Sequence, residues 1–266
     1  MIPTEYHPCQ VLVCDGSMNL SHAITRIIKK SGMLAKCTIV EKAAVCVSTL
    51  SRFDFDLAFV DVDMLNANGE DIITLAHRSG VRALFVAVSS RSSEACSELG
   101  RSKNVFAFLQ KPASEKKVLE ILETYRRVAE PRHVLAIDGE HRVRAEFEHA
   151  IHSSLFHLMI DVADGPESAI ALFRRKRHDI VFIDINLPSP GTADVMMKLK
   201  SLNAKVEFIL VSDNRGVKHS GSGRGEISDH LLHKPFMGDD VERILDDLIK
   251  YDPPQIGEQS GNLVLL

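Results

Sequence analysis

The sequence predicts an α/β protein built from two consecutive domains, each a doubly wound sheet of five parallel strands. Short apolar runs rich in Val and Ile, typical of strands buried on both faces, alternate with segments of helical spacing. The alternation occurs twice, because Asp15 after the first apolar run recurs as Asp138 (138 − 15 = 123). A period this long indicates a duplicated domain, and 266 residues accommodate two domains of the common size.

In the first half, each apolar run predicts a strand, and apolar residues spaced three or four positions apart predict the helices. Leu20, Ile24 and Ile28, for example, fall on one face of a helix. We expect strands near 10–15, 35–40, 56–61, 83–89 and 105–110. The connecting helices are expected near 18–31, 42–51, 68–78, 92–99 and 114–128.

The second half repeats this pattern. We expect strands near 133–138, 156–162, 179–184, 206–212 and 228–233. Helices are expected near 141–153, 165–176, 192–202 and 238–250. A further helix is disfavoured over residues 216–225, which contain four glycines and two serines. Residues 221–225 do not lead from a strand straight into a helix, so they are interpreted as a flexible loop rather than a phosphate-binding loop.

These elements predict a domain at residues 1–131, a second at 132–250, and an irregular C-terminal tail at 251–266. Residues 129–132 would form a short linker. The tail, with Pro253 and Pro254 near its start, is too short to fold as a separate output module.

Composition indicates a cytoplasmic protein. Hydrophobic content is 45%, no apolar run approaches the length of a membrane span, and residues 1–10 lack a signal-peptide pattern. All five cysteines lie in the first half without a CxxC pair, which favours reduced thiols. Lys and Arg number 16 against 15 acids in residues 1–131, and 16 against 21 in residues 132–266, so neither nucleic acid nor membrane is an expected partner. The basic run at 174–177 is interpreted as a solvated helix end.

Four polar positions keep the 123-residue period, and each follows or closes an apolar run. They are Asp15 and Asp138, Asp61 and Asp184, Ser89 and Ser212, and Lys111 and Lys234. The carboxyl ends of parallel strands share one edge of a sheet, so two carboxylates, a hydroxyl and an ammonium should meet there. Carboxylates bind Mg²⁺, and one can become an aspartyl phosphate when cations offset the developing charge.

In order and spacing, these segments resemble the response-regulator receiver domains of two-component signalling. The matching pairs are VLVCDG (11–16) with VLAIDG (134–139), FVDVDMLNANG (59–69) with FIDINLPSPG (182–191), AVSS (87–90) with LVSD (210–213), and QKPAS (110–114) with HKPFM (233–237). The resemblance implies two flavodoxin-like domains with strand order 2-1-3-4-5. It also implies a histidine kinase or phosphotransfer protein as phosphate donor and a downstream protein partner, and it leaves homodimerisation open.

The resemblance assigns a role to each site residue. The implied phosphoacceptors are Asp61 and Asp184. The implied Mg²⁺ site residues are Asp15, Asp61 and Asp63 in the first copy, and Asp138, Glu140, Asp184 and Asn186 in the second. The implied phosphoryl-binding and switch residues are Ser89, Lys111, Phe108, Ser212 and Lys234. The peptide bonds before Pro112 and Pro235 are expected to be cis.

Two departures from the family pattern alter these expectations. Receivers usually end the first strand with two adjacent acids, whereas this chain has Gly16 and Gly139 in the second place, which predicts weak Mg²⁺ binding. Glu140 could substitute in the second copy but Ser17 could not in the first, so we expect the second domain to be phosphorylated more readily. The switch ring of the first copy, Phe108, is Leu231 in the second.

The sequence therefore predicts a tandem-receiver response regulator that accepts phosphate on aspartate, signals by protein contact and is not an enzyme. The alternative is a scaffold of two pseudo-receivers that are never phosphorylated. A flavodoxin-like enzyme is disfavoured, because no substrate loop or cofactor motif is present.

Overall fold

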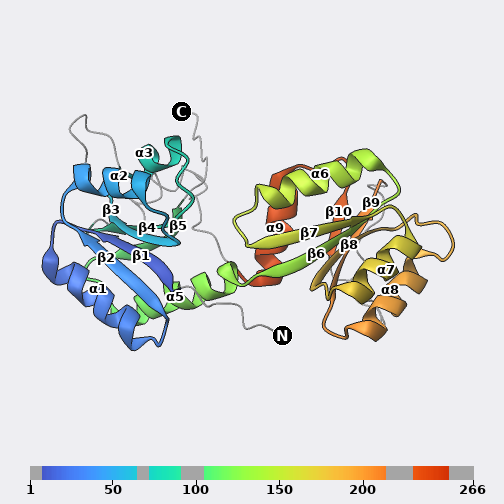
Figure 1. The fold of residues 1–266 in the computed structure, drawn as a ribbon, viewed down its shortest axis with the longest axis horizontal. Helices are drawn as coiled ribbons and strands as arrows, with labels where there is room; N and C mark the ends of the chain where they lie inside the picture. The colour runs from blue at the N-terminus through green and yellow to red at the C-terminus, as the bar shows by residue number, and fades with distance from the viewer. Residues whose placement is uncertain (1–7, 65–71, 91–104, 214–229, 252–266) are drawn as a thin grey trace, which may run out of the picture. The chain divides into compact units, whose positions relative to one another are not determined.

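The computed structural model describes residues 8–64, 72–90, 105–213 and 230–251 (Figure 1). The chain divides into two compact units between Tyr125 and Arg126. Unit 1 includes Met1–Tyr125, and unit 2 is Arg126–Tyr251. Each unit contains one sheet and is considered by itself below.

Unit 1 contains a five-stranded parallel sheet in the order β2-β1-β3-β4-β5. Its described elements are β1 (Cys9–Cys14), α1 (Met18–Lys30), β2 (Ala35–Val40), α2 (Ala43–Arg52), β3 (Leu57–Asp61), α3 (Ile72–Arg78), β4 (Leu84–Ser89), β5 (Val105–Gln110) and α5 (Glu115–Ala129). Helix α5 extends past the division between the units. Helices α1 and α5 cover one face of the sheet, and α2 and α3 cover the other (Figure 1).

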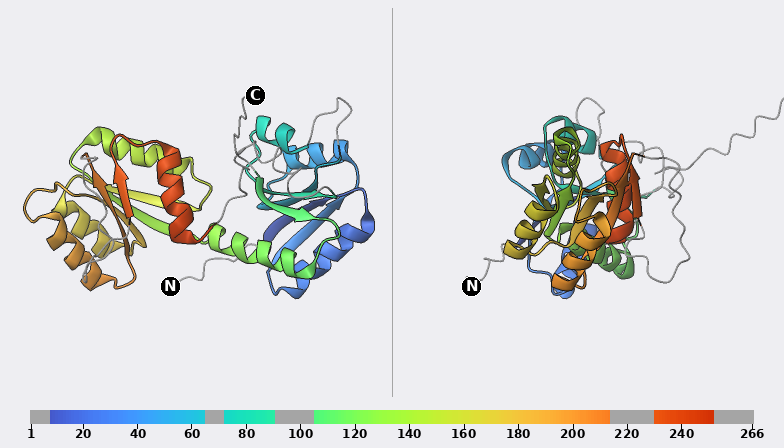
Figure 2. Two further views of the ribbon diagram at one scale, coloured as in Figure 1. Left: turned by 180° about the vertical axis from the view of Figure 1, so that it is seen from behind. Right: turned by 90° about the vertical axis from the view of Figure 1, so that its right-hand side faces the viewer.

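Unit 2 repeats this arrangement with the order β7-β6-β8-β9-β10. Its described elements are β6 (Arg132–Ile137), α6 (His141–His152), β7 (Leu158–Ala163), α7 (Pro166–Arg175), β8 (Ile180–Asp184), α8 (Thr192–Leu202), β9 (Glu207–Ser212), β10 (His230–His233) and α9 (Gly238–Ile249). Helices α6 and α9 lie on one face and α7 and α8 on the other, as Figure 2 also shows.

The predicted fold class, two doubly wound α/β domains with strand order 2-1-3-4-5, is confirmed. The described strands lie within two residues of their predicted starts and ends. The predicted helix at 92–99, the glycine-rich segment 216–225 and most of the predicted tail lie outside the described residues. In the described part of the chain, no helix is both long and apolar enough to cross a membrane.

Burial explains why these runs become central strands. Every residue of β3 and of β8 is buried, since helices pack on both faces of the sheet. The large core side chains repeat with the chain's period: Phe59 and Phe85 in unit 1 correspond to Phe182 and Phe208 in unit 2, all completely buried or nearly so. Because all strands are parallel, the polar residues after them gather at one edge of each sheet.

Candidate functional site

The carboxyl edge of the unit 1 sheet holds two buried carboxylates and one lysine. Asp15 follows β1 and Asp61 ends β3, with 2% and 7% of their surfaces exposed. Lys111 follows β5, and its Nζ lies 2.7 Å from Asp15 Oδ2 and 2.8 Å from Asp61 Oδ2. A long flexible side chain is required here, because β4 lies between β5 and β3. One ammonium group therefore bridges both carboxylates.

Backbone N–H groups hold the other oxygen of each carboxylate. The N–H of Ser17 donates to Asp15 Oδ1 at 2.7 Å, and the N–H of Asp63 donates to Asp61 Oδ1 at 2.9 Å. Each contact joins an aspartate to the backbone two residues further on, as in an Asx turn. The turns at the strand ends thus fix both carboxylates with their Oδ2 atoms at Lys111.

Ser89 and Phe108 complete the unit 1 edge. Ser89 ends β4 and is buried, and its carbonyl accepts a hydrogen bond of 2.7 Å from the N–H of Lys111. Phe108 lies on β5, half-buried, and packs against the unit 1 core. A hydroxyl and a ring therefore come from the strands nearest to the lysine.

The same contacts recur in unit 2. Nζ of Lys234 lies 2.7 Å from both Asp138 Oδ2 and Asp184 Oδ2. The N–H of Glu140 donates to Asp138 Oδ1, and the N–H of Asn186 donates to Asp184 Oδ1, both at 2.8 Å. Ser212 is buried at the end of β9, like Ser89 in unit 1. The two edges therefore match contact by contact.

Unit 2 also has an additional acid that sequence reasoning missed. Asp213 Oδ1 lies 3.6 Å from Lys234 Nζ. The signal was available in the LVSD segment, because Asp213 directly follows Ser212 whereas Ser90 stands at this position in the first copy. The lysine of unit 2 thus has three carboxylates around it instead of two.

Two further side chains support the strand ends of unit 2. Thr192 Oγ1 donates to the carbonyl of Asp184 at 2.7 Å, and Arg144 donates to the carbonyl of Asp138 at 2.6 Å. Both residues lie in the first turns of helices, α8 and α6, that begin close to the carboxyl edge. They hold the backbone that carries the aspartates, and no sequence motif pointed to them.

The electrostatic balance keeps both lysines charged. Burial by itself would lower the pKa of Lys111, but its close contacts with the carboxylates of Asp15 and Asp61 and their negative charges outweigh burial, so the pKa is raised above its ordinary value. The pKa of Lys234 is raised for the same reasons by Asp138 and Asp184, again against the effect of burial. Each site therefore contains a protonated lysine at physiological pH.

The carboxylate pairs fit a hard divalent cation in part. Oδ2 of Asp15 and Oδ2 of Asp138 are buried and have no hydrogen-bond partner, although each lies 2.7 Å from a lysine Nζ. These contacts are ion pairs without hydrogen-bond alignment, so both oxygens keep a lone pair that a hard cation could use. A second carboxylate, Asp61 or Asp184, stands beside each of them.

In the described part of the chain, neither aspartate pair is joined by a third acid in a metal-binding arrangement, although Asp213 lies near Lys234 in unit 2. Among the residues that the structure describes, no group of three or more His, Cys, Asp or Glu side chains is placed to hold a metal ion. A Cβ at Gly16 or Gly139 would meet no atom within 4 Å, so these positions have room for an acid but supply no charge. Glu140 is exposed, and the contact it makes with Asp138 uses its backbone N–H.

Two local expectations concern the cis peptide bonds and the ring on the last strand of each sheet. The peptide bonds before Pro112 and Pro235 are cis, as the resemblance implied, and the bond before Pro190 is also cis, which was not expected. Leu231 lies on β10 at the place that Phe108 holds on β5, so unit 2 has no ring there.

Comparison with known proteins identifies the family. The response regulator receiver domain matches this chain twice, over residues 11–123 and 134–246. Each match covers one of the two sheets except for the first two residues of β1 or β6, and together the matches cover most of the chain. The chain therefore belongs to the response regulator receiver domain family and carries two receiver domains in tandem.

Individual relatives are more distant. The chain is 34% identical over 82 residues to the probable transcriptional regulatory protein TcrX of Mycobacterium tuberculosis, and it spans about a third of that relative's length (35%). The structure of a probable two-component system response regulator/GGDEF domain protein aligns over 91% of this chain and 98% of its own, with 15% identity and a TM-score of 0.57. The chemotaxis response regulator CheY4 of Vibrio cholerae aligns over 44% of this chain and 98% of its own, with 18% identity and a TM-score of 0.39.

Proposed function

We propose that this chain is a tandem-receiver response regulator in which Asp61 and Asp184 each accept a phosphoryl group. The observation that carries this proposal is the lysine-bridged pair of buried carboxylates in both units. Two buried like charges beside one ammonium contribute little to stability, and apolar side chains often serve a core better. Their presence in both copies therefore favours chemistry over folding as the explanation.

The side chains of each site have distinct tasks in the proposed transfer. An acceptor carboxylate oxygen bonds to phosphorus while the bond from phosphorus to the donor's histidine nitrogen breaks, and that nitrogen then takes a proton. Lys111 and Lys234 keep an ammonium beside the new acyl phosphate and offset its charge. The hydroxyls of Ser89 and Ser212 donate to a phosphoryl oxygen.

The proposed cofactor is Mg²⁺, bound through carboxylate and carbonyl oxygens. The proposed ligands are Asp15, Asp61 and the carbonyl of Asp63 in unit 1, and Asp138, Asp184, Glu140 and the carbonyl of Asn186 in unit 2. The ion would supply positive charge to the transferring phosphoryl group. Because glycine stands where a third acid would strengthen binding, affinity should be low at both sites.

The proposed donor is a histidine kinase or phosphotransfer protein, the partners typical of receiver domains, and the proposed location is the cytoplasm. We propose that the output is contact with a downstream protein and that the chain is not an enzyme. Phe108, half-buried next to the unit 1 core, would report phosphorylation through its ring position. Leu231 would make the readout of unit 2 different.

Gly16 and Gly139 favour a second candidate, a pseudo-receiver scaffold that is never phosphorylated. With a lysine already paired to both aspartates, each site could keep its negative charge partly neutralised without further chemistry. In that case the carboxyl edges would serve as constitutive contact surfaces.

Phosphodonor labelling distinguishes the two candidates. The full chain is incubated with acetyl phosphate and Mg²⁺, and acid-stable, base-labile adducts are counted by intact mass. We expect labelling that Asp61→Asn and Asp184→Asn each reduce, and that the double variant abolishes. Asp54→Asn, an exposed aspartate at the opposite edge of the unit 1 sheet, is the control and should label normally. An unlabelled wild-type chain would support the scaffold, and labelling of the double variant would refute these acceptors.

A further inference from the structure

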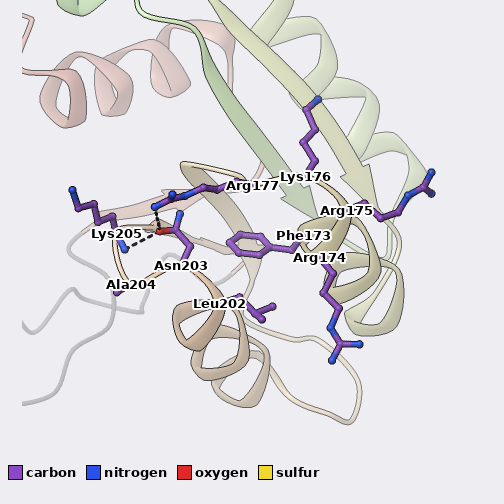
Figure 3. A pocket seen from close by; sticks show the side chains of 9 residues that line it. All are labelled: Phe173, Arg174, Arg175, Lys176, Arg177, Leu202, Asn203, Ala204 and Lys205. Carbon is purple, nitrogen blue, oxygen red and sulfur yellow. Dashed lines mark hydrogen bonds between the residues drawn. The ribbon is translucent and has the colours of Figure 1, made fainter. Parts of the chain in front are cut away.

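Unit 2 has a hollow of about 490 Å³ at the edge of its sheet opposite the carboxylates (Figure 3). It lies where α7 and α8 end, before β8 and β9 begin. Its lining residues are Phe173, Arg174, Arg175, Lys176, Arg177, Leu202, Asn203, Ala204 and Lys205. Strand β8 separates it from Asp184, so this surface is distinct from the proposed phosphoacceptor site.

The hollow is strongly basic. Five of its lining residues, here called the basic corner, are Arg174, Arg175, Lys176, Arg177 and Lys205, and none of the lining residues is acidic. Two helix C-termini at this corner account for roughly one unit of negative charge. Lys176 Nζ lies 3.3 Å from Asp161 Oδ2, which neutralises one more cation. About three positive charges therefore remain without compensation from helix ends or Asp161.

One member of the basic corner is held in place by a buried amide. Asn203 is 4% exposed, and its Oδ1 accepts a 2.9 Å hydrogen bond from the Arg177 guanidinium. The N–H of Lys205 donates to the same oxygen at 3.1 Å, and Nδ2 of Asn203 donates to the carbonyl of His178 at 3.0 Å. Arg177 is thus pre-positioned, which reduces the entropy lost when it binds an anion.

Unit 1 shows that the receiver fold does not require this charge. The 123-residue period places Ser51, Arg52, Phe53 and Asp54 at the corresponding corner, with Arg82 at the position of Lys205. Two cations and one acid leave one positive charge there, against five in unit 2. Helix α2 nevertheless ends normally with a single basic residue, Arg52, in its last turn. Helix capping therefore does not explain the basic corner.

We propose that the basic corner is a docking site for an acidic polypeptide segment of a partner protein. Figure 3 shows that Arg174, Arg175 and Lys176 point in different directions, which suits charges spread along a segment better than one small anion. Apolar surface is also present, because Leu202 is 46% exposed at the hollow, whose inner wall includes the buried Phe173. Arginine mixed with apolar surface is typical of protein interfaces.

Charge favours a polypeptide over nucleic acid. Residues 132–266 carry 16 Lys and Arg against 21 acids, so a long polyanion would meet repulsion outside the corner. A short acidic segment reaches only the local cluster and avoids that repulsion. The occupant is therefore an acidic segment with at least one apolar side chain that enters the hollow.

The test uses the full chain and a fluorescent synthetic peptide of roughly ten residues, long enough at about 3.3 Å per residue to cross the corner. The peptide consists of Asp and Glu with one central Leu, and binding is followed by fluorescence anisotropy. We expect Arg174→Glu combined with Arg175→Glu to weaken binding by about tenfold or more. The matched control is Lys116→Glu with Lys117→Glu, an exposed basic pair on α5, which should change binding by less than about twofold.

Three further measurements, with a second peptide, a DNA duplex and sedimentation, determine which class of molecule binds the basic corner. A peptide with Ser in place of Leu should bind about three- to tenfold more weakly, because the apolar contact is lost. Absence of peptide binding, equal loss in the control pair, or tighter binding of a DNA duplex of equal charge would overturn the proposal. So would self-association in sedimentation that the arginine variants abolish, since the occupant would then be a second copy. Acetyl phosphate labelling should be unchanged in these variants, so the outcome is independent of the proposed phosphoacceptors.

Discussion

Units 1 and 2 keep one edge of the sheet nearly identical and differ at the other. At the carboxyl edge, the lysine lies 2.7 and 2.8 Å from its two aspartates in unit 1 and 2.7 Å from both in unit 2. At the opposite edge, the corner that is basic in unit 2 carries an exposed phenylalanine, Phe53, in unit 1. The shared edge fits the same proposed chemistry in both units, and the divergent corner restricts the proposed docking site to unit 2.

Smaller differences surround the matched carboxylates. The side chain of Lys111 is 22% exposed, whereas that of Lys234 is 8% exposed and has Asp213 nearby. Phe108 in unit 1 corresponds to Leu231 in unit 2. The two aspartates and the lysine therefore lie in a wetter site in unit 1 and in a drier, more acidic site in unit 2. Three predictions test this contrast, and a fourth tests a difference elsewhere in the two units.

Removal of the bridging lysine should have the largest effect, and it should be larger in unit 2. Lys234→Met leaves two buried carboxylates without their cation, which should cost unit 2 roughly 3 kcal/mol. Lys111→Met should cost about 1–2 kcal/mol, since water screens the more exposed site. Hydrogen exchange resolved by peptide, without divalent cations, measures each unit. The control Lys116→Met, at an exposed lysine, should change the stability by less than about 0.5 kcal/mol. Equal losses of stability in Lys111→Met and Lys234→Met would contradict the difference between the two sites.

Addition of a third acid should strengthen Mg²⁺ binding more in unit 1. Gly16→Asp places a carboxylate in open space, and we expect roughly tenfold tighter binding. Gly139→Asp should give a smaller gain, because unit 2 already has Asp213 near its lysine. Mg²⁺ titrations followed by NMR measure both variants. Ser51→Asp makes the same charge change at the opposite edge, and a similar gain there would exclude a local effect.

The extra acids of unit 2 should also speed its phosphorylation. We expect Asp184 to be labelled about three- to tenfold faster than Asp61 at limiting Mg²⁺. Glu140→Ala should reduce the difference if its exposed carboxylate turns toward the ion, whereas Glu148→Ala on the exposed side of α6 should not. Peptide mapping of the labelled chain gives both rates. Faster labelling of Asp61, or a normal rate in Glu140→Ala, would contradict this prediction.

The smallest expected effect is a pH dependence of folding stability, which should be confined to unit 2. Burial, with the nearby charge of Lys176, lowers the pKa of His133 from its ordinary 6.5. The unfolded chain therefore binds this proton more readily, so unit 2 should lose stability as pH falls below 6.5. His133→Gln introduces the residue that unit 1 has at Gln10, and it should reduce the loss of stability on acidification. The change in the free energy of unfolding should be less than about 1 kcal/mol, because the ring is only half-buried. An unchanged slope between neutral pH and pH 5.5, measured by urea unfolding, would exclude His133 as the cause.

Local sequence determined the fold and the members of the site. Apolar runs such as Val11 to Cys14, alternating with segments of helical spacing, predict buried strands between helices, and the 123-residue period marks the same polar positions in both copies. Parallel strands place those positions at one edge, so their approach to one another follows from the fold class alone. The fold class and the members of the site could be predicted because strand burial and helix amphipathicity are patterns within a few neighbouring residues.

Tertiary structure decided how these groups pair. Lys111 and Asp61 are 50 positions apart, and their contact depends on the strand order and on the reach of the lysine across β4. The tertiary structure likewise brings Asp213 close to Lys234 and so adds it to the site. The side chain of Glu140, by contrast, is exposed. The basic run at 174–177 ends α7 with exposed side chains, as the sequence predicted, and Asn203 and Lys205, which follow α8, additionally make it part of a hollow. Contacts between distant segments depend on packing geometry, which residue patterns along the chain do not contain.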